Sequence, residues 1–198
     1  RSRGLGDVYK RQAPAAVEEV RKRYPGKKII FSIGRLVAYK GYKYLIESAH
    51  YLDDDYVILI GGSGAMKYDL EAEIETWGVQ DKVMLLGRIS DKELSAYYGA
   101  CTLFCLSSVQ KTEAFGIVQI EAMSCGKPVV ATNIPHSGVS WVNAHGFSGL
   151  NVTPCSAKEL AGAIMTITRN DDLYQKLAKG ARERYQETFT KEKMIDKI

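Results

Sequence analysis

The sequence predicts an α/β protein, a Rossmann-like parallel sheet of about six strands flanked by helices. Short segments that are apolar throughout, such as 29–33 and 56–60, alternate with longer amphipathic segments. Strands of this kind are typical of a parallel sheet that is covered on both faces, because both rows of side chains must be buried. In such sheets ligands bind beyond the carboxyl ends of the strands. We therefore expect the functional loops directly after the strands, where small residues recur: Gly34, Gly61, Gly87 and Ser107.

The individual elements follow from periodicity and from turn residues. Strands are expected at 29–33, 56–60, 83–86, 103–106, 129–132 and 149–152. Helices are expected at about 15–24, 42–52, 66–77, 91–98, 116–124, 157–168 and 171–187, with a helical tail from Lys191. Pro25-Gly26 ends the first helix and Gly126 the fifth, while Asp91 can cap the fourth.

The chain reads as one domain preceded by a short segment. Its 198 residues are enough to bury one core. Residues 1–12 join no periodic pattern and read as a linker or non-native segment. Together with the first helix they form region 1–26, and the domain is expected over 27–198.

Composition indicates an ordinary globular protein, with 45% apolar and 25% charged residues. No apolar run reaches the roughly 20 residues of a membrane span, and no apolar segment follows the basic N-terminus.

The four cysteines are Cys101, Cys105, Cys125 and Cys155. They form no CxxC pair, so buried reduced thiols are expected rather than a zinc site. Reduced thiols fit the cytoplasm, which is the expected location.

Basic residues concentrate in two places, the N-terminus and residues 21–28, and the net charge is +4. A solvated basic face is one interpretation. Attraction to anionic lipid at the inner face of the membrane, or to a phosphorylated ligand, is the other. Binding of nucleic acid is not expected, because no matching motif occurs.

Two glycine-containing loops follow the first two strands. Gly34-Arg35 and then Lys40-Gly41 place a guanidinium and an ammonium where they could meet phosphate oxygens; a surface loop with two solvated cations is the alternative. Gly61-Gly62-Ser63-Gly64 could cradle a phosphate with backbone amides, but it is neither a complete GxGxxG nor a P-loop. A tight turn explains it as well.

The strongest signal is a pair of carboxylates, Glu113 and Glu121, across a loop-to-helix junction. Eight helical steps would separate them by about 12 Å, which matches the reach from a hexose across a diphosphate to a ribose. Carboxylates accept hydrogen bonds from vicinal hydroxyls. The helix start near Phe115-Gly116 offers free amides and a positive dipole to a diphosphate between them. Two solvated glutamates on a helix face are the alternative.

The segment EAFGIVQIEAMSCGKPVVAT, residues 113–132, resembles the signature of glycosyltransferase family 4, which has the two-domain GT-B fold. GRLVAYKG, residues 34–41, is similar to the donor motif of that family, and GGSG (61–64) and LLGRIS (85–90) fall where its next donor loops lie. The resemblance covers about residues 27–198 and identifies this region as the C-terminal, nucleotide-sugar-binding half.

The resemblance implies a role for each matching position. Arg35 and Lys40 would bind the donor diphosphate and stabilise the leaving group. Glu113 would contact sugar hydroxyls, and Glu121 would hold the ribose. Other donor contacts would come from the backbone, at Gly34, Gly62, Arg88, Phe115, Gly116 and Ile117. The family needs no metal and no cofactor besides the nucleotide sugar, and it retains the anomeric configuration.

The expected function is therefore hexosyl transfer from a nucleotide-diphosphate sugar to a glycan or lipid-linked acceptor. The N-terminal acceptor half is not recognisable before Lys27, so turnover by this chain alone is not expected. A non-catalytic nucleotide-sugar-binding module that works with a partner chain is the alternative. A nicotinamide dehydrogenase is disfavoured, because Gly34 is followed by no second glycine until Gly41. Asp53-Asp54-Asp55 contains an Asp-x-Asp, but it precedes a strand and reads as a turn.

Overall fold

The computed structural model describes residues 13–190 and residue 193. Within them, six parallel strands form one sheet in the order β3-β2-β1-β4-β5-β6. The strands are β1 (Lys28–Ile33), β2 (Tyr56–Gly61), β3 (Val83–Gly87), β4 (Leu103–Leu106), β5 (Val129–Thr132) and β6 (Gly149–Val152). The predicted parallel α/β fold and the six predicted strands are confirmed.

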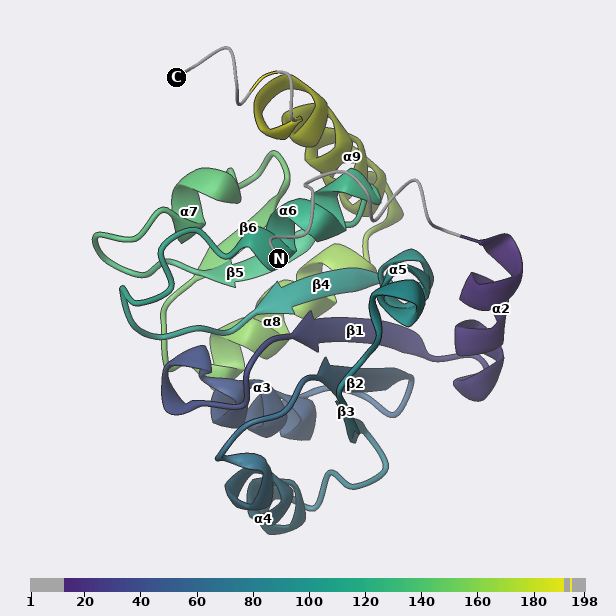
Figure 1. Cartoon of the computed structure of the whole chain (residues 1–198), viewed down its shortest axis with the longest axis vertical. Coiled ribbons are helices and arrows are strands. Elements are labelled where there is room, and N and C mark those ends of the chain that lie inside the picture. The colour runs from purple at the N-terminus through teal and green to yellow at the C-terminus, as the bar shows by residue number, and fades with distance from the viewer. Residues whose placement is uncertain (1–12, 191–192, 194–198) are drawn as a thin grey trace.

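Helices cover both faces of this sheet (Figure 1). The α-helices are α2 (Pro14–Arg23), α3 (Tyr42–Ser48), α4 (Lys67–Trp77), α5 (Asp91–Ala100), α6 (Ile117–Ser124), α7 (Val139–Val142), α8 (Ala157–Thr168) and α9 (Asp171–Arg184). Shorter turns are η1 (Ala38–Lys40), η2 (Ala49–Tyr51) and η3 (Tyr185–Phe189).

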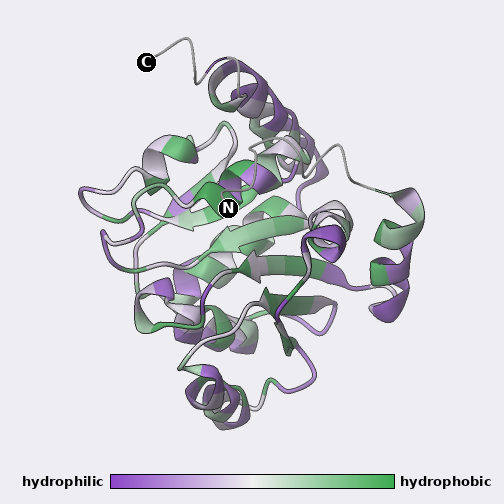
Figure 2. Cartoon of the chain, viewed as in Figure 1, coloured by the Kyte–Doolittle hydropathy of each residue, from purple (hydrophilic) through white to green (hydrophobic). Residues whose placement is uncertain are grey.

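Each strand divides its side chains between two cores. In β1, Ile29 and Phe31 face the core under α2, α5 and α6, whereas Ile30 faces the core under α3, α4 and α8. Burial on both faces explains why the strands are apolar throughout, and Figure 2 shows most of their length in the green of hydrophobic residues. Because Val20 of α2 is buried in the first core, this helix packs onto the domain.

Several predicted boundaries are wrong in detail. The helix expected at 42–52 ends at Ser48 and continues as the tighter turn η2, and the helix expected to reach Glu187 ends at Arg184 and continues as the wider turn η3. The short helix α7 was not predicted, because four residues are too few to show a period. The predicted tail from Lys191 and the segment 1–12 lie outside the described residues, apart from residue 193.

The prediction that the cysteine thiols are buried is confirmed for three of the four cysteines. Cys101, Cys105 and Cys125 are buried, but Cys155 is exposed, because it lies in the turn between β6 and α8 with a positive φ of 63°. Over the part of the chain that is described, the helices are too short or too polar to cross a bilayer.

Candidate functional site

The candidate site lies where the chain connections of the sheet diverge. Strands β1 and β4 are neighbours, and the sheet is extended from β1 through β2 and from β4 through β5. The loops after β1 and β4 therefore leave toward opposite faces and open a crevice at the carboxyl edge. Lys40 lies in η1 after β1, and Glu113 lies in the loop after β4.

Lys40 and Glu113 form an ion pair in this crevice. The Lys40 ammonium donates to Oε2 of Glu113 at 2.5 Å, and each residue is only 9% exposed. The sequence assigned these residues to different parts of a ligand. The structure brings them into direct contact, so the position of one depends on the other.

Three serines hold this pair. From the sequence, Ser107 was noted as a small residue at the end of a strand, but none of the three was given a role in the site. Ser108 donates to Oε2 of Glu113 at 2.8 Å, and Ser137 donates to the Glu113 carbonyl at 2.5 Å. Ser107 donates to the Lys40 carbonyl at 2.9 Å. Two of them could have been assigned to the site, because Ser107-Ser108 directly follows a buried apolar strand. A pair of polar residues at that position indicates hydrogen bonding at the carboxyl edge of the sheet. Ser137 comes from a distant loop and left no such signal.

Helix α6 begins at the crevice, directly after Gly116. Gly116 has φ 60° and ψ 61°, and a Cβ on it would lie 2.4 Å from Cδ2 of Leu106. Only glycine fits both the left-handed backbone and this close approach. The first amides of a helix generally lack a carbonyl partner within it; here the Gln119 amide donates to the Gly116 carbonyl at 2.9 Å, and the amides of Ile117 and Val118 precede it. The flanking Phe115 and Ile117 are 53% and 57% exposed, so the start of the helix is open to a ligand.

Glu121 lies on α6 but is not at the surface. It is 6% exposed, and its Oε2 accepts a hydrogen bond from the Tyr98 hydroxyl of α5 at 2.8 Å. The alternative of two solvated glutamates is therefore wrong for both Glu113 and Glu121. The spacing argument needs a correction as well: Glu113 precedes the helix, which starts at Ile117, so the 12 Å helical distance does not apply.

Tyr98 is a second residue that the sequence reasoning missed. It is fully buried, and burial together with the adjacent Glu121 carboxylate raises the pKa of its phenol well above the usual value. The phenol therefore stays protonated and donates. Its partner lies 23 positions away, so no local pattern could have identified it.

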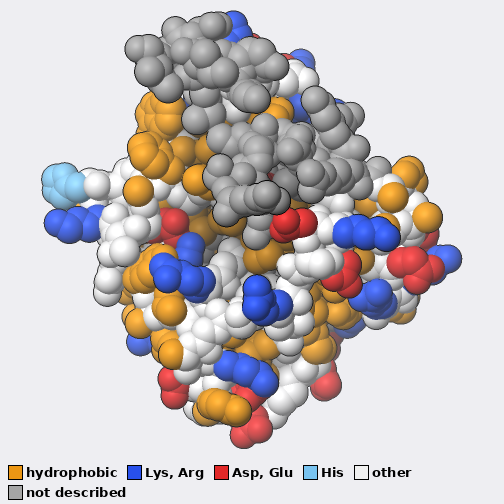
Figure 3. Space-filling view, in the orientation of Figure 1, with side chains coloured by type: hydrophobic (Ala, Val, Ile, Leu, Met, Phe, Trp, Pro, Cys, Tyr) orange, Lys and Arg blue, Asp and Glu red, His pale blue; other side chains and the backbone are white. Residues whose placement is uncertain are grey.

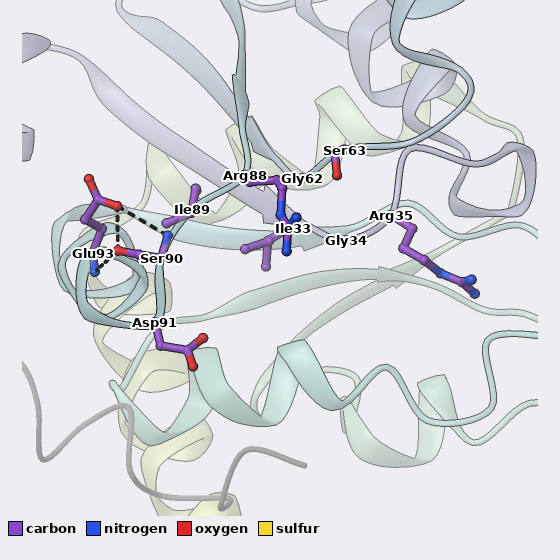
Figure 4. A pocket seen from close by; sticks show the side chains of 10 residues that line it. All are labelled: Ile33, Gly34, Arg35, Gly62, Ser63, Arg88, Ile89, Ser90, Asp91 and Glu93. Carbon is purple, nitrogen blue, oxygen red and sulfur yellow. Dashed lines mark hydrogen bonds between the residues drawn. The ribbon is translucent and has the colours of Figure 1, made fainter. Parts of the chain in front are cut away.

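A pocket of about 660 Å³ lies beside the crevice, at the carboxyl ends of β1, β2 and β3 (Figure 4). Four of the predicted residues line it: Gly34, Arg35, Gly62 and Arg88. The other six predicted residues do not: Lys40, Glu113, Phe115, Gly116, Ile117 and Glu121. The structure thus distributes the predicted residues between a pocket and the adjacent crevice.

The pocket has a polar wall of four further residues, of which only Ser63 and Ser90 lie within the donor-loop motifs found in the sequence. Ser63, Ser90, Asp91 and Glu93 also line it, and Glu93 accepts from the backbone amide and the hydroxyl of Ser90 at the start of α5. These contacts lower the pKa of the Glu93 carboxyl, so this wall carries a negative charge at neutral pH.

The floor of the pocket is built by two loops whose backbones touch. Gly62 has φ 132°, and a Cβ on it would lie 1.8 Å from the Gly34 carbonyl oxygen. The Gly34 amide donates to the Gly61 carbonyl, and the Gly62 amide donates to the Gly87 carbonyl. Position 62 therefore requires glycine, because the Gly34 carbonyl leaves no room for a Cβ. Both interpretations of this loop, a phosphate cradle and a tight turn, are compatible with that requirement.

Arg35 is exposed, and its guanidinium reaches the Tyr39 hydroxyl at 3.3 Å. In Figure 4 its side chain extends away from Arg88. Figure 3 shows Lys and Arg side chains around the hollow in the middle of this face.

The Asp53–Asp55 turn lies elsewhere, and its carboxylates pair with Arg169, Lys82 and Lys28 respectively, in agreement with its interpretation as a structural turn.

Residues 16–184 match the family described as Glycosyl transferases group 1. The chain belongs to this family. Among curated group 1 relatives, the D-rhamnosyltransferase WbpZ of Pseudomonas aeruginosa is 28% identical over 184 residues, which are 93% of this chain and 47% of WbpZ. The chain thus spans about half the length of this relative.

Two solved structures agree with this fold. HepE of Anabaena in complex with UDP-glucose superposes with a TM-score of 0.84 at 25% identity, over 93% of this chain and 51% of HepE. The C-terminal domain of the group 1 protein LpcC from Francisella tularensis gives 0.76 at 21% identity and covers 96% of this chain and 95% of that domain. The chain therefore has the fold of the C-terminal half of a GT-B glycosyltransferase.

Proposed function

We propose that this domain binds a nucleotide-diphosphate sugar and, together with an N-terminal half, transfers its hexosyl group with retention to a glycan or lipid-linked acceptor. The observation that carries the proposal is the Lys40–Glu113 pair at the open start of α6, beside a pocket of about 660 Å³. That volume lies within the usual range for small-molecule sites, roughly 300–1,000 Å³. A cation, a helix N-terminus and a pocket at one sheet edge suit an elongated anionic ligand.

In this proposal the diphosphate lies over the start of α6. Lys40 has three N–H donors and uses one for Glu113, so two can reach phosphate oxygens. Arg35 is exposed and within one short loop of Lys40, and a change of rotamer would bring it to the same group. The amides of Phe115, Gly116 and Ile117 would add donors and the helix dipole.

The two glutamates take the two ends of the ligand. Glu113 would accept from sugar hydroxyls and Glu121 from the ribose. The base would occupy the pocket between the glycine loops of Gly34 and Gly62 and the backbone of Arg88. Because Glu121 is already held by Tyr98, it would be presented to the ribose in one orientation, which reduces the entropy lost on binding.

Departure of the nucleoside diphosphate places new negative charge on the β-phosphate. Lys40, Arg35 and the helix start would stabilise that charge, and cations in a closed cleft can do so without a metal ion. The complex of HepE with UDP-glucose supports a nucleotide sugar as the class of donor. The donor base and sugar are left open.

Calorimetric titration with UDP-glucose, GDP-mannose and ADP-glucose tests the binding step. We expect one of the three to bind at one site per chain, with affinity that does not change on addition of chelator. Binding of none of them, with the chain shown to be folded, would contradict the proposal.

A transfer assay separates the enzyme from its alternative, a non-catalytic binding module. Labelled donor is incubated with the chain alone and with the N-terminal half of a homologous glycosyltransferase. We expect negligible transfer by the chain alone and transfer with retained configuration when the halves are combined. Binding without transfer in every combination would favour the binding module.

A further inference from the structure

A second pocket lies at the opposite end of the sheet. It has a volume of about 320 Å³ and is bordered by the end of α2, the turn at Gly26, the end of α5 and the starts of β1 and β4. Its floor is formed by the buried residues Ile29 and Cys101. In strand β1, Ile29 lines this pocket and Ile33 lines the first, and the four steps between them span about 13 Å at a rise of roughly 3.3 Å per residue. The two pockets are therefore distinct.

Three cations from three different segments line this pocket. Arg21 comes from α2, Lys27 from the turn before β1, and Lys127 from the turn between α6 and β5. Among the described residues, none that lines the pocket is Asp or Glu. A rim with this much uncompensated positive charge around a hollow favours an anion.

The three cations keep donors available. Arg21 uses one guanidinium nitrogen for the Gly99 carbonyl at 3.3 Å, and Lys27 donates to the Asp54 carbonyl. For the Lys127 ammonium, the described part of the chain offers no hydrogen bond or carboxylate partner. Guanidinium has five N–H donors and ammonium three, so each group can still bind an oxyanion.

Arg21 and Lys127 act on the same point at the floor of the pocket. Burial raises the pKa of the Cys101 thiol to about 12, and the positive charges of Lys127 and Arg21 both oppose this rise. Arg21 likewise opposes the rise that burial causes in the pKa of Tyr174, which lines the pocket as well. The charges of Arg21 and Lys127 therefore lie close enough to act on the thiol of Cys101, beside the pocket that all three residues line.

The positive charges at the end of α2 have a structural explanation, but it does not extend to Lys127. Arg21, Lys22 and Arg23 occupy the last turn of α2, where positive charge stabilises the helix dipole. Lys127 lies in another segment, more than a hundred positions along the chain, so the charge pattern of the last turn of α2 does not account for its presence at the pocket. Its convergence with Arg21 on one hollow needs a different reason.

We propose that this pocket is a second, phosphate-binding site, separate from the proposed donor site. The ligand is a phosphate group, gripped by Arg21 and Lys127 with Lys27 at the rim. The small volume suits a phosphate with at most a small substituent. A free phosphate monoester and the headgroup of an anionic phospholipid carry the same group, and the basic run 21–28 is accounted for by either source.

Titration of inorganic phosphate into the ¹⁵N-labelled chain tests the site, with sodium chloride at matched ionic strength as the reference. We expect saturable shifts of the Gly26, Thr102 and Lys127 amides, and none with chloride. The variant Arg21→Gln/Lys127→Gln should weaken phosphate binding by about tenfold or more, because two charge-assisted contacts are removed. The single variant Lys127→Gln breaks no side-chain hydrogen bond or ion pair of the described residues. A weaker response to phosphate in this variant would therefore reflect the lost charge and not the loss of such a contact.

Lys22→Gln is the matched control for Lys127→Gln, because each removes one positive charge and Lys22 does not line the pocket. Its affinity for phosphate should equal that of the wild type. An equal loss in Lys22→Gln, or shifts that never saturate, would show only general electrostatic attraction and would overturn the proposal.

Flotation with vesicles of phosphatidylglycerol and phosphatidylcholine distinguishes the two sources. Flotation that the Arg21→Gln/Lys127→Gln variant loses and Lys22→Gln retains would identify a lipid headgroup. Saturable phosphate binding without flotation would identify a free phosphate ligand. The absence of both responses would overturn the proposed site. That result would not bear on the binding of a nucleotide sugar at the other pocket.

Discussion

The ammonium of Lys40 and the carboxylate of Glu113 are 2.5 Å apart, although 73 positions separate them in the chain. The contact exists because β1 and β4 are neighbours in the sheet and their following loops meet at its carboxyl edge. Within this ion pair each charge neutralises the other. A diphosphate would therefore meet a lysine whose position is set by the glutamate.

This relationship predicts that the two residues do not act independently. Lys40→Ala should weaken binding of the preferred nucleoside diphosphate by about tenfold or more, as expected for a charged hydrogen bond. Glu113→Ala should also weaken it, because Lys40 loses its anchor, and the double variant should lose less than the sum of both. Calorimetry on the four proteins measures this coupling, and Lys43→Ala, at a nearby exposed lysine, is the control. Strictly additive losses would show that the ion pair does not position Lys40.

Tyr98→Phe should destabilise the domain and weaken nucleotide binding. The substitution removes one donor to buried Glu121, and loss of a hydrogen bond to a charged group costs about 1.5–3 kcal/mol. Tyr97→Phe is the matched control, because the neighbouring phenol only accepts a 3.4 Å bond from Arg23. Urea unfolding and calorimetry of both variants check this prediction, which fails if the two behave alike.

Gly116→Ala should destabilise more than Gly78→Ala. Both glycines have φ near 60°, but a Cβ on Gly78 would meet nothing within 4 Å, whereas one on Gly116 would meet Leu106. Gly78→Ala thus measures the strain of the left-handed backbone, about 1–2 kcal/mol, and any additional loss in Gly116→Ala measures the close approach. Only Gly116→Ala should also reduce affinity for a nucleoside diphosphate. Urea unfolding gives the first comparison and calorimetry the second.

The four cysteines should differ sharply in reactivity. Burial raises the pKa of Cys101 and Cys105 to about 12 and that of Cys125 to about 11, so at pH 8 they are protonated as well as shielded. Cys155 is exposed. A disulfide reagent should therefore label one thiol rapidly in the native chain and four after unfolding, and Cys155→Ser should abolish the rapid phase. Rapid labelling of a second thiol at pH 8 would contradict the burial of the other three.

Much of the fold was determined by the sequence alone. Strands that are buried on both faces must be apolar throughout, so β1, β2 and β4 could be located from composition, and the intervening helices from their period. The same logic indicated that the loops after the strands carry the site, because parallel strands end at one edge. Gly62 and Gly116 could be singled out too, because glycine in a loop of this kind usually marks a special backbone conformation.

Only the tertiary structure decided how the site residues relate to one another. The ion pair of Lys40 and Glu113 and the bond from Tyr98 to Glu121 join segments that are distant in the chain, and such contacts leave no periodic trace. The pocket floored by Cys101 depends likewise on which loops the sheet order brings together. Local propensity and periodicity report on a residue and its near neighbours, whereas these contacts arise from strand order, which is fixed only when the whole core packs.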